Sequence, residues 1–160
     1  MIRCMGEPHR KRLPHDVPLW IDPGKEVYYL TICCQPRNQN HLARPEIAHA
    51  LFETVQFRND NGIWFAHVLL LMPDHLHALM SFPPSGKTIK SVIAHWKERT
   101  AKRLGISWQR DFFEHRLRSE ESRLEKADYI LNNPVRASLV KQPEEWPFVW
   151  FPAPPTATHW

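Results

Sequence analysis

Apolar and polar residues follow two periods along this chain, one typical of strands and the other of helices. Four segments are rich in β-branched, aromatic and leucine residues and are predicted to be strands: 27–34, 63–71, 72–82 and, more weakly, 111–117. Three segments carry apolar residues three and four positions apart and are predicted to be helices: 45–58, 87–104 and 119–133. This order predicts an α+β domain, with an antiparallel sheet and helices packed mainly on one face.

Two histidines stand in the middle of the most strand-like segment. Side chains alternate between the two faces of a strand, so His75 and His77 project side by side with Leu79. The opposite face of the segment is wholly apolar: Leu76, Ala78, Met80 and Phe82. Two imidazoles on one face are close enough to hold one divalent metal, although a pair of this kind also occurs by chance.

The last predicted helix carries a second group of polar residues. With about 100° per residue, Leu124, Ala127 and Leu131 share a face, and Tyr129 and Asn133 lie nearly opposite it. If this helix packs beside the histidine strand, Asn133 can supply a third metal ligand and Tyr129 lies next to the metal. Taken alone, Tyr129 is also compatible with a surface tyrosine, and Asn133 with a residue that only ends a helix.

Length and composition describe an ordinary globular protein. The chain has 160 residues, of which 42% are apolar and 24% charged, a size that suits one domain. We divide it into a proline-containing basic arm (1–24), a central domain (25–142) and a tail rich in proline and tryptophan (143–160). No apolar run approaches the roughly 20 residues that span a bilayer, and the first residues lack the apolar region of a signal peptide. We therefore expect no membrane association and a cytoplasmic location.

Positive charge is concentrated in two places. The net charge is +4 and the pI is about 9.1, which points to an acidic partner. A cluster near the N-terminus and one predicted helix supply the candidate nucleic-acid contacts: Arg10, Lys11, Arg12, Lys90, Lys97, Arg99, Lys102 and Arg103. For the helix, a solvated polar face remains the alternative.

Three motifs together resemble those of one family. The segments 72–77 (MPDHLH), 108–115 (WQRDFFEH) and 128–136 (DYILNNPVR) are similar to motifs of the REP-associated tyrosine transposases, in the same order. These enzymes belong to the single-tyrosine His-hydrophobe-His (HUH) superfamily, and the likeness runs from about residue 28 to residue 146. The resemblance implies a ferredoxin-like HUH fold.

The resemblance also implies a role for individual residues. Paired metal ligands would be His75 and His77, the third ligand Asn133 and the nucleophile Tyr129, with accessory roles for Glu114, His115 and Lys126. A Mg²⁺ or Mn²⁺ ion would polarise a scissile phosphate. Attack by tyrosine would leave a 5′-phosphotyrosine and a free 3′-OH. The expected partner is single-stranded or hairpin DNA carrying REP-like palindromes, bound by a monomer or a homodimer.

Other functions remain open on the sequence. One is a domesticated, non-catalytic protein that binds DNA hairpins on the same fold. Another is a metal-dependent hydrolase that uses water, in which Tyr129 would be dispensable. A relaxase or replication initiator shares the chemistry but usually needs a larger, multidomain chain.

Overall fold

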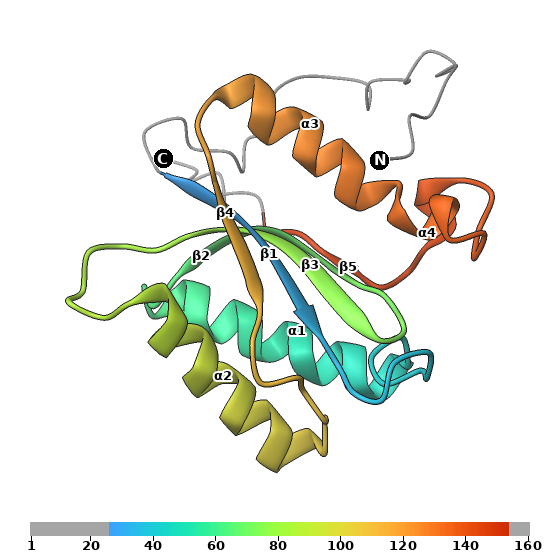
Figure 1. Ribbon diagram of the computed structural model, residues 1–160, viewed down its shortest axis with the longest axis horizontal. Coiled ribbons are helices and arrows are strands. Elements are labelled where there is room, and N and C mark those ends of the chain that lie inside the picture. Colours follow the sequence, from blue (N-terminus) through green and yellow to red (C-terminus); the bar gives the residue numbers. More distant parts are fainter. Residues whose placement is uncertain (1–25, 154–160) are drawn as a thin grey trace, which may run out of the picture.

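A five-stranded antiparallel sheet forms the centre of the protein (Figure 1). The computed structural model describes residues 26–153. Its elements, in chain order, are β1 (Val27–Cys33), α1 (Pro45–Asp60), β2 (Phe65–Leu71), β3 (His75–Ser81), α2 (Ile89–Leu104), β4 (Phe113–Leu117), α3 (Glu120–Leu131), α4 (Asn133–Arg136), a 3₁₀ turn (Pro143–Glu145) and β5 (Val149–Trp150). The strand order β4-β1-β3-β2-β5 places the histidine strand β3 at the middle of the sheet. The predicted α+β fold is confirmed, and so are all four predicted strands.

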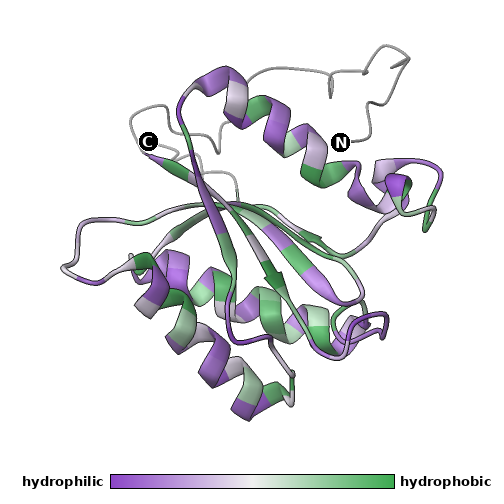
Figure 2. Cartoon of the chain, in the orientation of Figure 1, coloured by the Kyte–Doolittle hydropathy of each residue, from purple (hydrophilic) through white to green (hydrophobic). Residues whose placement is uncertain are grey.

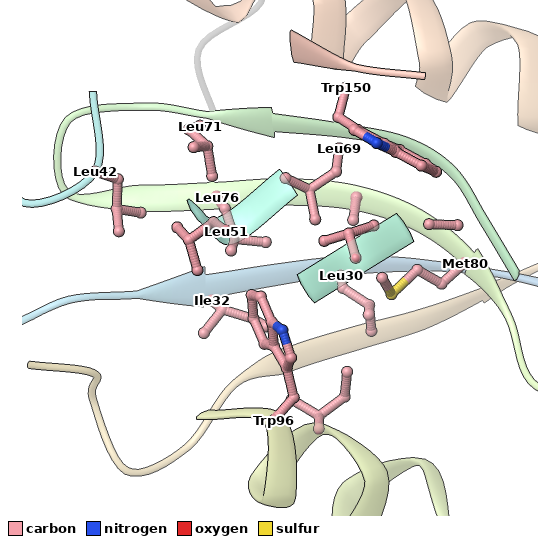
Figure 3. Packing of buried hydrophobic residues seen from close by; sticks show 14 of the residues in the cluster. Leu30, Ile32, Leu42, Leu51, Leu69, Leu71, Leu76, Met80, Trp96 and Trp150 are labelled. Atoms are coloured by element: carbon pink, nitrogen blue, oxygen red, sulfur yellow. The ribbon is translucent and has the colours of Figure 1, made fainter. Parts of the chain in front are cut away.

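One face of the sheet is covered by α1 and α2 (Figure 1). Alternate residues of the three central strands point into this layer, among them Leu30, Leu69 and Leu76, and all three are fully buried. Figure 3 shows these leucines packed with Trp96 of α2. The face opposite the two histidines in β3 is therefore the main core, as the alternation predicts.

On the other face of the sheet, α3 is the helix that packs on the second apolar cluster within residues 26–153, together with Trp146 and Val149. Ala127, Ile130 and Leu131 of α3 pack on Val68 and Leu79 of the sheet. Two helices thus share one face, while the third lies on the face that carries the histidines (Figure 1). Hydrophilic and hydrophobic residues alternate along α2 and α3 (Figure 2), as expected for helices with one buried side.

Local sequence sets the helix ends. The Thr88 hydroxyl caps α2 by accepting a hydrogen bond from the Ser91 N–H at 3.1 Å. The same helix ends at Gly105, whose φ of 69° is a left-handed conformation that glycine adopts without strain. The Ser119 side chain caps α3 by accepting a hydrogen bond from the Ser122 N–H.

The last helix is shorter than predicted. We expected it to run to Asn133, but α3 ends at Leu131 and the short α4 begins at Asn133. Pro134 explains the break, because proline has no N–H for the helical ladder and disfavours helical geometry in the residue before it. The break leaves Asn132 between the two helices and places Asn133 at the first position of α4.

The first part of the predicted tail is integrated into the domain. Residues Val149 and Trp150 form β5, which pairs with β2 at the edge of the sheet, and the Trp150 side chain is buried in the main core. The Trp146 indole N–H donates to the Leu71 carbonyl at 3.0 Å. Aromatic burial thus draws residues up to at least 150 into the fold, beyond our boundary at residue 142.

Candidate active site

His75 and His77 lie side by side on the face of the sheet that α3 covers. Their rings are 4.8 Å apart between centroids and nearly perpendicular, at 81°. In the sheet, His77 pairs with Thr31 of β1, and His75 pairs with Cys33. The structure therefore confirms the shared orientation that strand alternation predicted.

Asp74 orients the first of these histidines. Its Oδ1 lies 2.8 Å from His75 Nδ1, and its Oδ2 accepts a hydrogen bond from the Asn38 N–H at 2.8 Å and forms an ion pair with Arg37 Nε at 3.1 Å. Burial raises the pKa of Asp74, but the bonds from Asn38 and His75 and the charge of Arg37 lower it further than burial raises it. Because an ionised carboxylate can only accept, Nδ1 of His75 carries the hydrogen, and Nε2 is the ring nitrogen that Asp74 leaves unbonded.

Two hydroxyl groups hold the second histidine. His77 Nδ1 lies 2.9 Å from the Tyr29 hydroxyl and 3.0 Å from that of Thr31. Both oxygens can accept from Nδ1–H, and in that tautomer Nε2 of His77 is available as well. Burial, followed by the nearby charges of His75, Arg136 and Lys126, lowers the pKa of His77 to about 3. His77 is therefore neutral near pH 7, which is the form that binds a metal.

Tyr129 projects from α3 beside two cations. The Lys126 ammonium lies 5.0 Å from the centre of the Tyr129 ring and 4.6 Å from that of Tyr29. The Arg136 guanidinium lies 3.8 Å from the Tyr129 ring and donates to the Tyr129 carbonyl at 2.7 Å. Because the charges of Lys126 and Arg136 also act on His77, the structure brings the predicted nucleophile and the predicted ligand strand together.

Exposure distinguishes Tyr129 from the other tyrosine of the site. Tyr129 is 42% exposed, whereas Tyr29 is 8% exposed and its hydroxyl is bonded to His77. Burial also raises the pKa of Tyr29 above its usual value. Of the two phenols, only that of Tyr129 is free to meet a substrate from solution.

Asn133 lies half-buried at the first position of α4. Its side-chain amide makes no hydrogen bond to any residue between 26 and 153, so its oxygen is free to act as a ligand. In the same range, no group of three or more histidine, cysteine, aspartate or glutamate side chains could hold a metal ion. A metal at the histidine pair would thus need a ligand of another type, and Asn133 is the candidate that the sequence predicted.

Comparison with known proteins identifies relatives of one kind. A protein of Haemophilus influenzae, provisionally named a REP-associated tyrosine transposase, is 27% identical over 78% of this chain and 79% of its own length. The REP-associated tyrosine transposase of Escherichia coli is 31% identical, over about half of each chain (51%). The chain is related to the REP-associated tyrosine transposases. No family model matches it.

Solved structures show the same fold. A REP-associated tyrosine transposase bound to a REP hairpin aligns with a TM-score of 0.66 and 22% identity, over 91% of this chain and 82% of that one. A provisionally named transposase from Deinococcus radiodurans aligns with a TM-score of 0.50 and 21% identity, over 68% of this chain and 90% of that one. The family's fold, expected from the sequence motifs, is thereby confirmed.

The candidate DNA contacts on α2 lie on the other face of the sheet, away from the histidines. Lys90, Arg99, Lys102 and Arg103 are exposed. Lys97 is different and corrects our prediction: it is buried, and its ammonium donates to the carbonyls of Gln109 and Arg110 at 2.6 and 2.9 Å. Lys97 holds the loop before β4 and cannot reach a phosphate in this arrangement. Arg10, Lys11 and Arg12 lie outside the described residues.

The two accessory candidates on β4 point in opposite directions. His115 pairs with Tyr29 and faces the candidate site, whereas Glu114 pairs with Leu30 and faces the side of α1 and α2. His115 thus stays a candidate for contact with substrate. The structure does not bring Glu114 to the histidines.

Sequence reasoning missed three features of the site. It assigned no role to Asp74, although this residue precedes His75 directly, and none to the Tyr29 and Thr31 hydroxyls that hold His77. Arg136 lies within the motif at 128–136, but the sequence assigned it no function. Asp74 beside His75, and Arg136 seven residues after Tyr129, lie close in sequence to predicted site residues, whereas the contacts of Tyr29 and Thr31 with His77 join segments far apart in the sequence.

Within residues 26–153, no helix combines the length and the apolar character needed to cross a bilayer.

Proposed function

We propose that the protein cleaves and rejoins single-stranded DNA at REP-type hairpins, with Tyr129 as the nucleophile. The observation that carries this proposal is an exposed tyrosine beside two cations, on the same sheet face as two histidines that each keep Nε2 free. The kinship with REP-associated tyrosine transposases, one of which has been solved with a REP hairpin, supports this class of substrate.

The residues present fit a divalent ion. His75 and His77 would supply two imidazole nitrogens and Asn133 an amide oxygen, three protein ligands that leave positions open for substrate, as in catalytic metal sites. The family resemblance implies Mg²⁺ or Mn²⁺ as the ion. When bound, such an ion polarises the scissile phosphate and neutralises part of its charge. Asp74 would keep His75 in the ligating tautomer, as carboxylates commonly do for metal-binding histidines.

The side chains on α3 and α4 would perform the transfer. The ammonium of Lys126 and the guanidinium of Arg136 would bind the non-bridging phosphate oxygens and place phosphorus in line with the Tyr129 hydroxyl. The Tyr129 hydroxyl gives its proton to water and its oxygen forms a bond to phosphorus, the bond from phosphorus to the 3′-oxygen breaks, and that oxygen takes up a proton from water. The 5′-phosphotyrosine keeps the energy of the phosphodiester, so a 3′-hydroxyl can reverse the step and reseal a strand without ATP.

A covalent adduct tests the proposal. The protein is incubated with Mn²⁺ and a labelled single strand that carries candidate hairpins, and the products are separated on a denaturing gel. Wild type should form a protein–DNA adduct and Tyr129→Phe should form none. Tyr28→Phe is the matched control, because Tyr28 lies on the opposite sheet face, and it should behave like wild type. An adduct with Tyr129→Phe would refute the assignment.

Two other outcomes would favour the alternatives. Cleavage that leaves a free 5′-phosphate without any covalent species would indicate a metal-dependent hydrolase. Hairpin binding without cleavage would indicate a domesticated binding protein. The metal role has its own test: His77→Ala should abolish cleavage while largely sparing hairpin binding, and unchanged cleavage would remove His77 from the ligand set.

A further inference from the structure

An aromatic ring lies open to solvent at the edge of the candidate site. Phe113, the first residue of β4, is 57% exposed. It pairs with Thr31, which is the same residue that bonds His77 on the next strand. Phe113 and His77 are therefore two inter-strand spacings apart on one face, or about 10 Å. A scattered exposed apolar residue is ordinary, but this one lies in the same transverse row as the ligand histidine.

The ring continues a series of aromatic contacts that leads to the histidines. The edge-to-face contact of Phe113 with Tyr29 has a centroid distance of 6.1 Å and an angle of 69°. Tyr29 in turn stacks on His77, at 5.7 Å and 15°. Tyr29 thus supports Phe113 from the side of the site, while the rest of the Phe113 ring faces water. An apolar ring that is fixed by its neighbour and otherwise uncovered is a ready stacking surface.

Cations without acidic partners lie next to this series of rings. Lys126 is positioned between the rings of Tyr29 and Tyr129, and Arg136 lies over Tyr129. Neither cation forms an ion pair with a carboxylate of residues 26–153. Sites for single-stranded nucleic acid combine these same two elements, since cations bind the backbone phosphates and aromatic rings stack on the bases.

We propose that Phe113 is the stacking platform for an unpaired DNA base next to the phosphate that Tyr129 attacks. This inference rests on the proposed function and adds a base-binding subsite to it. The occupant is an unpaired base, because a base inside a duplex already has both faces covered by its neighbours. Stacking of this kind tolerates every base, so Phe113 would position the strand without choosing its sequence.

The test measures binding and chemistry separately. Binding is measured on the Tyr129→Phe background, with a DNA hairpin whose single-stranded flanks carry 2-aminopurine at one position at a time. One flank position should show quenched fluorescence that depends on the ring at residue 113. Phe113→Leu should weaken binding by roughly 5- to 150-fold, the equivalent of one base–ring stack, and Phe113→Tyr should retain the affinity. Phe57→Leu is the matched control, because Phe57 is equally exposed but lies on α1, on the far side of the sheet.

An abasic substrate completes the test. Removing the base at the quenched position should abolish the difference between Phe113 and Leu at residue 113. If Phe113→Leu binds as tightly as the parent protein, or loses affinity equally with and without that base, the inference is overturned. If the ring-dependent quenching is found but wild type forms no adduct with DNA, the base subsite stands and the proposed chemistry fails. If the adduct forms and no position depends on Phe113, the subsite alone fails.

Discussion

Acidification should destabilise the protein through His77, and the pKa of this residue sets how much the free energy of unfolding falls. This side chain is 7% exposed, and its Nδ1 is bonded to the hydroxyls of Tyr29 and Thr31. Burial and the neighbouring charges of His75, Arg136 and Lys126 lower its pKa from 6.5 to about 3. In the unfolded chain the same imidazole returns to water and takes up a proton near its ordinary pKa.

The direction and magnitude of the stability change follow from the difference between the folded and unfolded pKa of His77. Below pH 6.5 His77 is protonated in the unfolded state, whereas in the folded state it stays neutral until the pH reaches about 3. The free energy of unfolding therefore falls as the pH drops through this window, by about 1.4 kcal/mol for each pH unit. Above pH 6.5 the contribution is fully present, and its whole loss across the window amounts to roughly 5 kcal/mol.

Urea denaturation of two proteins isolates this contribution. Wild type and His77→Asn are unfolded at several pH values between 7 and 4.5, in EDTA so that no metal stabilises the folded state. Carboxylates such as Asp74 titrate in both proteins, so their effect cancels to first order in the difference between the two. The stability advantage of wild type over His77→Asn should shrink as the pH falls. His115→Asn is the control, because His115 is exposed and stays in water in both states. A constant difference between wild type and His77→Asn from pH 7 to 4.5 would refute the reasoning.

Three further predictions concern Asp74, Lys97 and two arginines of α2. Asp74→Asn should lower the affinity for Mn²⁺ by about 10- to 100-fold, because a neutral amide replaces the charged carboxylate that fixes the His75 tautomer. Calorimetric titration checks this, and equal affinity would contradict it. Lys97→Met should reduce the free energy of unfolding, measured in urea, by about 2–4 kcal/mol because two charged hydrogen bonds are lost. The same variant should leave the salt dependence of DNA binding unchanged. Arg99→Gln combined with Arg103→Gln should not slow cleavage of a short single strand, because α2 lies on the face away from the histidines. The rate of adduct formation measures this, and slower cleavage would place the substrate on the face of α2.

The local pattern of the sequence determined the elements and the facing of their residues. Strand alternation is a property of the backbone itself, so it placed His75 and His77 on one face and Leu76 on the other before any tertiary contact was known. Helical spacing in the same way separated Tyr129 from the buried side of its helix. The family resemblance added the expectation that these two segments meet.

Only the tertiary structure decided how side chains from distant segments are paired. Lys97 and Arg99 are two residues apart on one basic helix, yet Lys97 is buried against the carbonyls of Gln109 and Arg110 while Arg99 is exposed. Charge patterns cannot make this distinction, because it depends on which loop packs over which part of the helix. The histidine pair shows the same limit: alternation aligns the two rings, but whether each Nε2 is free for a metal depends on hydroxyls and a carboxylate that folding brings to each Nδ1.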